Sequence, residues 1–150
     1  QVIEKRETKQ KLDKLKTRGD WIRETQVVFN VFIRTRDAGR SCICCGRNRD
    51  PSRAIGGTWD AGHYRSRGSA PHLRFDERNV HAQLKQCNRY DSGNVAGYRL
   101  GLIERIGHAA LDELEADQTP RRYTTAELQA IKAEYTAKTK ALKHAQELCT

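Results

Sequence analysis

The sequence predicts an α+β protein that is mostly helical, with a small core of two strands and a helix between long N- and C-terminal helices. Three observations lead to this prediction. Apolar residues recur at helical spacing on both sides of the centre, whereas the stretch from Trp59 to Asn88 fits strand, loop, strand and helix. Hydrophobic residues make up only 37% of the chain and charged residues 31%, which indicates a thin core and solvated helices.

A single domain accounts for a chain of 150 residues. We divide it into N-terminal helices over residues 1–38, a core over residues 39–94 and C-terminal helices over residues 95–150. The first residue is Gln1 and the sequence contains no methionine, so we expect a fragment that lacks an N-terminal segment.

The charge balance favours a polyanionic partner. The 28 basic and 19 acidic residues give a net charge of +9, and the isoelectric point is about 9.6. Nucleic acid is the first candidate, and an anionic membrane surface is the alternative. We expect neither a transmembrane helix nor a secretory signal, because no stretch of the sequence is long and apolar enough for either.

The N-terminal part is expected to form two helices of different character. Residues 2–18 are mostly charged, which fits either a solvated helix or a basic arm beside a phosphate backbone. Residues 21–36 hold the largest apolar cluster of the chain, and their length and polar interruptions favour a buried helix. Asp20 can cap this helix, and Ala38 and Gly39 end it.

The five cysteines, at positions 42, 44, 45, 87 and 149, are odd in number and crowded, which indicates a metal site in a reducing compartment rather than disulfides. Cys42 and Cys45 form the motif CxxCG, whose tight turn lets two thiolates bind a structural zinc ion. Cys87 is expected to join them, and Cys44 to point elsewhere. The fourth ligand is uncertain, because Leu84 stands three positions before Cys87 where a second CxxC pair would begin.

His81, Cys44 or a more distant group could complete this zinc site. Alternatively, the cysteines could be held together by packing without a metal ion.

The segment around His63 carries the candidate chemistry. We expect a first strand before His63, a second near residues 73–75 and a helix from residue 80 onward. Asn79 would then precede the first turn of that helix, and Asn88 would lie about two and a half turns along it. One pocket could thus hold an imidazole that deprotonates water and oxygen ligands that bind a divalent cation, which is the chemistry of metal-assisted phosphodiester hydrolysis. Taken singly, His63 fits a loop residue and Asn79 a helix N-cap.

The C-terminal part is expected to be helical throughout. One helix should run from Val95 to about Gly107, and a short acidic helix should follow it to Asp117. Thr124 and Glu127 predict a capping box at the start of a long final helix. Apolar residues form one stripe along that helix, which predicts packing on the core or, alternatively, a dimer contact: Leu128, Ile131, Tyr135 and Leu142.

These motifs together resemble a known group of proteins. A CxxCG motif, a histidine after a strand and two asparagines nine positions apart are similar to HNH nucleases, which have a ββα-metal, treble-clef-like core. The segments WDAGHYRS, APHLRFDERNVHAQ and CNRYDSGN more closely resemble the NinG/Rap family of lambda-like phage recombination endonucleases. This similarity extends from about Trp21 to the final helix.

The resemblance implies a metal-dependent, structure-specific DNA endonuclease of the Holliday-junction resolvase type, which cleaves Holliday junctions and D-loops by phosphodiester hydrolysis. His63 matches the general base, and Asn79 matches the residue that orients it. Asn88 matches a ligand of a Mg²⁺ or Mn²⁺ ion. Asp60 is the nearest carboxylate that could complete this site, because Gly62 stands where HNH enzymes place an Asp or His. Six side chains would contact DNA: Arg65, Arg67, Arg74, His81, Lys85 and Arg89.

The resemblance further implies branched DNA as the partner and the cytoplasm of the bacterial host as the location of a phage-encoded protein. A homodimer is expected, because the resolution of a four-way junction requires cuts on two strands related by near two-fold symmetry. The alternative is a non-catalytic DNA-binding module with a decayed nuclease site. Gly62 and Leu84, which replace expected metal ligands, favour this alternative.

Overall fold

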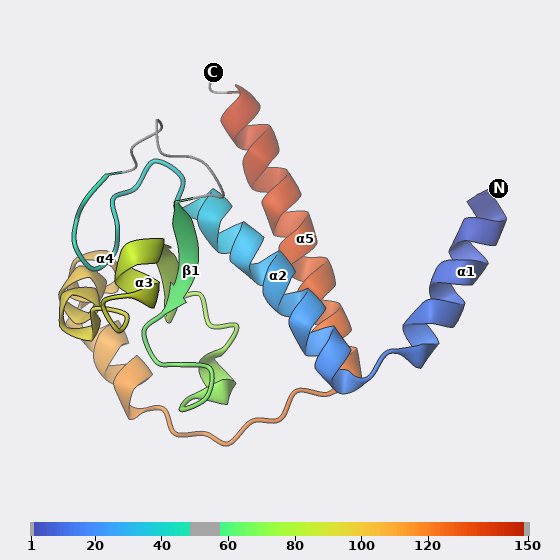
Figure 1. Cartoon of the computed structure of the whole chain (residues 1–150), viewed down its shortest axis with the longest axis horizontal. Coiled ribbons are helices and arrows are strands. Elements are labelled where there is room, and N and C mark those ends of the chain that lie inside the picture. The colour runs from blue at the N-terminus through green and yellow to red at the C-terminus, as the bar shows by residue number, and fades with distance from the viewer. Residues whose placement is uncertain (1, 49–57, 149–150) are drawn as a thin grey trace.

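A computed structural model describes residues 2–48 and 58–148, and it is an α+β structure composed mostly of helices (Figure 1). The predicted class, α+β and mostly helical, is therefore confirmed. The elements in chain order are α1 (Val2–Leu15), α2 (Arg18–Arg36), β1 (Trp59–His63), the short 3₁₀ helix η2 (Pro71–Leu73), β2 (Val80–Leu84), α3 (Lys85–Arg89), α4 (Val95–Ala116) and α5 (Thr125–Leu148). None of the helices in the described ranges could cross a membrane.

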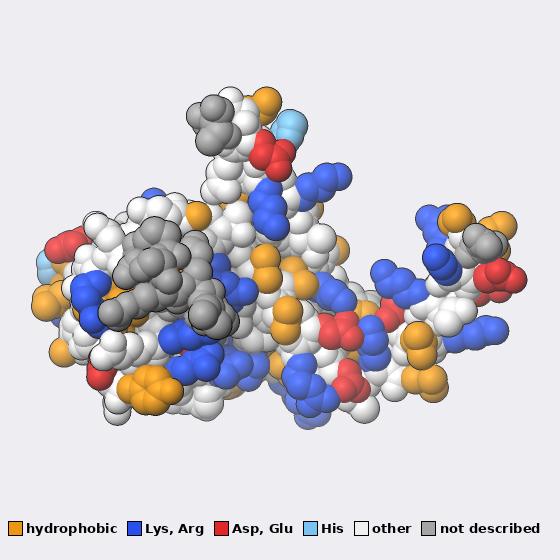
Figure 2. Space-filling model, turned by 45° about the horizontal axis from the view of Figure 1, so that its top comes forward, with side chains coloured by type: hydrophobic (Ala, Val, Ile, Leu, Met, Phe, Trp, Pro, Cys, Tyr) orange, Lys and Arg blue, Asp and Glu red, His pale blue; other side chains and the backbone are white. Residues whose placement is uncertain are grey.

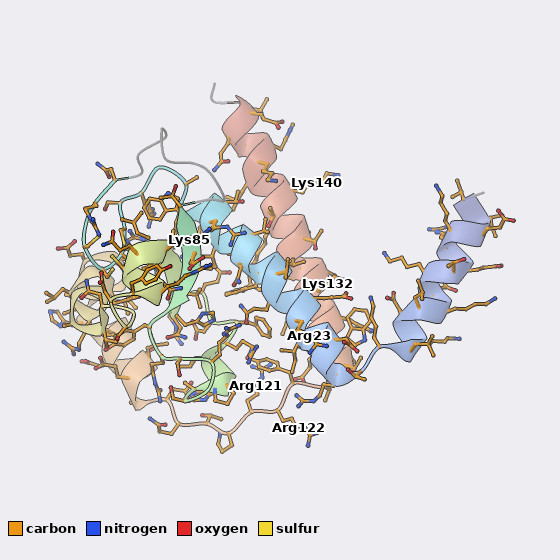
Figure 3. The ribbon with its side chains drawn as sticks, in the orientation of Figure 1. Arg23, Lys85, Arg121, Arg122, Lys132 and Lys140 are labelled. Atoms are coloured by element: carbon orange, nitrogen blue, oxygen red, sulfur yellow. The ribbon has the colours of Figure 1, made fainter. Side chains whose placement is uncertain are left out.

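Helices α2 and α5 lie side by side and form one layer of the molecule (Figure 1). Their contact is built on aromatic rings: Phe29 meets Tyr135 edge to face, with 4.7 Å between ring centroids. The predicted stripe on the final helix therefore packs within the chain, with Leu128 fully buried and Tyr135 nearly so. Lys132 pairs with Glu24 at 2.6 Å along the same contact (Figure 3).

Strands β1 and β2 form an antiparallel two-stranded sheet, in which Asp60 pairs with Gln83 and His63 with Val80. This corrects the predicted helix from residue 80 onward and the predicted strand near residues 73–75, which is a 3₁₀ turn instead. The run Val80–Leu84 is buried on both faces, so it shows none of the alternation that usually reveals a strand. Asn88 consequently lies in the first turns of the five-residue helix α3.

Helix α4 covers the cysteine-containing turn and packs with it into a hydrophobic core that is separate from the α2–α5 contact. Gly101 and Gly97 allow this approach, because a Cβ atom at Gly101 would lie 1.8 Å from the carbonyl oxygen of Ile43. Gly107, with φ of 82°, kinks α4 where the sequence predicts a break between two helices. The Tyr98 hydroxyl donates to Gly62 O at 2.7 Å, which ties α4 to the sheet.

The helix ends follow local capping rules. Thr17 caps α2 and Asp20 completes the capping box from inside the helix, so the helix begins earlier than predicted. Thr124 and Glu127 form the predicted capping box of α5. Helix α1 buries none of its residues and projects away from the other elements (Figure 1).

Candidate functional site

Four cysteine side chains form a cluster between the turn after α2 and helix α3. The Sγ atoms of Cys42, Cys44, Cys45 and Cys87 all lie within 4.8 Å of one another, and three of the four residues are buried. The expectation that Cys44 points elsewhere is wrong: it supplies the fourth sulfur that Leu84 could not. Cys149 lies outside the described residues.

Hydrogen-bond donors surround the sulfur atoms. Leu84 N donates to Cys42 Sγ at 3.2 Å, and Gln83 Nε2 to Cys44 Sγ at 3.3 Å. The Arg47 guanidinium reaches Cys45 at 3.3 Å and also contacts Cys87. Burial opposes ionisation of Cys45, but Arg47 outweighs it and lowers the pKa of this thiol to about 7. Such donors stabilise thiolates, so this set of four sulfurs fits a structural metal ion such as tetrahedral zinc.

A polar cleft of about 410 Å³ opens between α2 and the sheet, and we call it the basic cleft. Figure 2 shows Lys and Arg side chains gathered near the place where α2 meets the rest of the fold. The lining residues come from α2, β1, the loop after β1 and α3: Asn30, Arg34, Asp60, Ala61, His63, Ser66, Arg67, Asn88 and Arg89. Three predicted site residues, His63, Asp60 and Asn88, thus line the same cleft.

Asp60 is already paired at the edge of this cleft. Arg89 donates to its carboxylate from Nε at 2.8 Å and from Nη2 at 2.9 Å, and Asn88 Nδ2 donates at 3.0 Å. Although burial raises the pKa of Asp60, Arg89 and Asn88 outweigh it and lower that pKa below its usual value. Asp60 is therefore an anion at neutral pH, and its charge is balanced by Arg89.

His63 is held in place by backbone groups at the end of β1. Its Nε2 atom lies 3.0 Å from Arg74 O. Burial lowers its pKa to about 4, and the positive charges of Arg67 and Arg74 act in the same direction. The imidazole is therefore neutral at pH 7.

Asn79 acts from outside the cleft. It is fully buried, and its Oδ1 atom accepts a hydrogen bond from Arg65 N at 2.8 Å. Its Nδ2 atom donates to Arg65 O at 3.0 Å and to Leu73 O at 3.2 Å. These bonds hold both ends of the loop between β1 and η2, so Asn79 shapes the loop that follows His63 and is neither a helix cap nor a cleft residue.

Two predicted DNA-contacting residues serve the fold instead. The guanidinium of Arg65 donates to the carbonyl oxygens of Leu114 and Asp117, which fastens the loop after β1 to the end of α4. His81 is 4% exposed and its ring lies edge-on to Tyr98. Arg65 is not free to bind DNA because the C-terminal end of α4 lies within hydrogen-bond distance of its guanidinium. His81 is not free because β2 directs its side chain into the core.

The remaining predicted cations have mixed positions. Arg67 is exposed in the basic cleft, whereas Arg74 is half-buried, and its Nη1 lies 3.5 Å from Gln26 Oε1. Lys85 begins α3 beside β1 (Figure 3). Sequence reasoning missed Arg34 of α2, although the polar positions 30 and 34 lie one turn apart on one face of that helix and were a usable signal.

Comparisons with known proteins place the chain among phage proteins. Residues 1–147 match the family described as Bacteriophage Lambda NinG protein. Over 129 residues the chain is 51% identical to Protein ninG of Salmonella phage P22, covering 86% of this chain and 61% of that protein. It is 46% identical over 132 residues to Protein ninG of Escherichia phage lambda, covering 88% and 62% respectively. The chain thus spans less than two thirds of these curated relatives, and no solved structure matches it.

These findings correct part of the expected identity. The matching family and relatives are NinG proteins, and nothing in their descriptions indicates an HNH nuclease, a recombination endonuclease or cleavage of Holliday junctions. The attribution to that nuclease superfamily was wrong, and the junction-cleaving function drawn from it falls with it. What the similarity does establish is that the chain belongs to the NinG family of bacteriophage proteins.

Proposed function

We propose that this chain is a DNA-binding protein that holds phosphates in the basic cleft and is braced by a zinc ion on its four clustered cysteines. The observation that carries the proposal is the charge of the cleft, which is lined by Arg34, Arg67 and Arg89 but by one acid, Asp60. Since Arg89 balances Asp60, the other two guanidinium groups leave a net positive cleft. Arg groups in such a setting favour phosphate, whose oxygens they can bind in pairs.

The cysteine cluster supports this function indirectly. It joins the turn after α2 to α3, and α3 carries Asn88 and Arg89 into the cleft. A tetrahedral zinc ion on these sulfurs would keep α3 at a set distance from the sheet. The metal would thus be structural and take no part in phosphate binding.

A double variant of the cleft tests the proposal. Arg34→Gln with Arg67→Gln removes two charges that have no ion pair within residues 2–48 and 58–148, so the fold should be retained. The affinity for DNA should fall by roughly tenfold or more, measured by fluorescence anisotropy at fixed salt. Arg6→Gln with Lys9→Gln on α1 is the matched control for the lost charge. Equal losses in the two double variants would show that only the total charge matters and would contradict a phosphate site in the cleft.

Metal-dependent DNA cleavage is a second candidate, and it does not include any preference for junctions. It is favoured by one observation: a neutral imidazole, His63, lines the same cleft as the oxygens of Asp60 and Asn88. Oxygens of this kind bind Mg²⁺ or Mn²⁺, and such an ion would have to take the place of Arg89 on the Asp60 carboxylate. There it would also bind a substrate phosphate and stabilise the charge of the leaving oxygen. His63 would accept the proton of the attacking water.

The cleavage candidate is tested by plasmid nicking with Mg²⁺ and with a chelator. His63→Ala should lower the nicking rate by about 100-fold while DNA affinity stays near that of the unchanged chain. An unchanged nicking rate in this variant would assign the activity to a contaminant or to another site.

Two further expectations remain proposals. A DNA-binding protein of a phage meets its ligand in the host cytoplasm, which we propose as its location.

The second is the homodimer. The apolar stripe on α5 packs within the chain, so it is not available for a partner. The dimer prediction therefore rests on the exposed Val27 of α2 and not on junction symmetry. A monomer in light scattering at micromolar concentration, with and without DNA, would exclude the dimer.

A further inference from the structure

The basic cleft continues along strand β1 into a second hollow. This hollow, of about 470 Å³, shares Arg34 with the cleft and includes Arg40 of the turn after α2 together with Thr58 and Trp59. The cleft borders β1 from Asp60 to His63, and the second hollow borders its first residue and the one before. Both therefore follow the same strand, and we call the two together the β1 groove.

The β1 groove is positive along its length. Within the described ranges, Arg34, Arg40 and Arg67 form no ion pair, and they stand at its middle and towards its two ends. The two carboxylates among its described residues are neutralised by neighbours: Asp37 by Arg36 at 2.8 Å, and Asp60 by Arg89. Within the described ranges, a linear polyanion that follows β1 would therefore meet unpaired guanidinium groups and no unpaired carboxylate.

Among the described residues that line this path, one is aromatic. Trp59 is half-buried: it packs on the core beside the cysteine cluster and also lines the second hollow. It stands four residues before His63, a separation of roughly 13 Å along a strand. A positive groove that tracks a backbone, with an aromatic ring on which a base can stack, is the arrangement that binds single-stranded nucleic acid.

We propose that the β1 groove binds a single-stranded segment of nucleic acid, with its phosphates on Arg34 and Arg67 and one base stacked on Trp59. This inference rests on the proposed function and specifies the form of nucleic acid that the site takes. A duplex cannot use Trp59 in this way, because its bases are already stacked on one another and turned inward.

Tryptophan fluorescence tests this directly, because the chain has two tryptophans and the other one lies in the α2–α5 core. Trp21→Phe keeps an aromatic ring there and leaves Trp59 as the only reporter. An oligothymidylate of about 16 nucleotides, the upper site size of single-strand-binding folds, should quench Trp59 emission with a saturable curve. A duplex of the same length at the same salt should leave the emission nearly unchanged.

Two variants separate stacking from filling of the hollow. Trp59→Leu should weaken binding of the single strand by about tenfold, whereas Trp59→Phe should retain most of it and duplex affinity should not change in either. Anisotropy of labelled DNA is recorded in parallel. Binding by anisotropy without quenching of Trp59 would overturn the single-strand proposal and leave the proposed function standing, whereas absence of binding to either DNA form would overturn both.

Discussion

At the scale of residues, the site depends on buried groups that never reach the cleft. Asn79 holds the loop after β1 through three hydrogen bonds, and Tyr98 joins Gly62 to α4. A sequence can reveal His63, Asp60 and Asn88 as candidates because their chemistry is local. It cannot reveal that the Arg65 guanidinium donates hydrogen bonds to carbonyl oxygens at the end of α4, because that contact joins residues about fifty positions apart.

The buried His81 and the half-buried His63 predict a pH dependence of stability. Burial lowers the pKa of His63 to about 4 and that of His81 to about 3, whereas an unfolded histidine has a pKa near 6.5. The unfolded chain therefore binds more protons, and the free energy of unfolding should fall as the pH drops from about 6.5 to 4, by up to roughly 3 kcal/mol for each residue.

Urea unfolding at several pH values measures the slope of the free energy of unfolding against pH. His81→Gln should flatten the dependence on pH, because one of the two histidines with a lowered pKa has been removed. His108→Gln, at an exposed position, is the control for the substitution itself. An unchanged slope in the His81 variant would contradict the account of a neutral buried imidazole.

At the scale of elements, the long helices could be predicted from the sequence and the sheet only in part. The helix over residues 21–36, the break at Gly107 and the capping box at Thr124 all follow from local patterns that need no partner. Strand β2 could not be recognised, because a strand buried on both faces looks like a short piece of buried helix. Because residues 80–84 form a strand and not the start of a helix, Asn88 lies nearer the start of its helix than predicted. It nevertheless lines the cleft.

The contact of α4 with the cysteine turn predicts a strong effect at Gly101. Gly101→Ala places a methyl group against Ile43 O, so α4 must move away from the turn. We expect a loss of about 1–3 kcal/mol in the free energy of unfolding, measured by thermal denaturation. Gly68→Ala is the matched control, because an added Cβ at this exposed position would meet only the Ser66 hydroxyl, at 3.9 Å. Similar melting temperatures for both variants would contradict the close approach.

At the scale of the whole molecule, two cores of different kinds meet at the cleft. The α2–α5 layer is built on aromatic packing, whereas the part that contains α3 and α4 is built around the cysteine cluster. Arg34 comes from the first part and Asn88 and Arg89 come from the second. The cleft therefore depends on both, and the cysteine cluster affects it through α3.

Metal removal should therefore destabilise the part that contains α3 and α4 more than the α2–α5 layer. A chelator, or Cys87→Ser, should abolish bound zinc, measured as metal content per chain, and should weaken DNA binding. The α2–α5 layer should keep most of its helical signal in circular dichroism, because the described residues of its core include no cysteine. Full binding by a metal-free chain would show that packing alone holds α3 in place.

In the proposed function, the guanidinium groups of the basic cleft bind DNA phosphates. The most direct measurement is the slope of the logarithm of the DNA association constant against the logarithm of salt concentration. Each phosphate contact contributes about 0.9 to the magnitude of this slope on duplex DNA, or about 0.7 on a single strand. The double variant Arg34→Gln, Arg67→Gln should therefore lower the slope by about 1.4–1.8 relative to the unchanged chain. An identical slope in the two proteins would mean that these arginines do not touch phosphate, and it would contradict the proposed function.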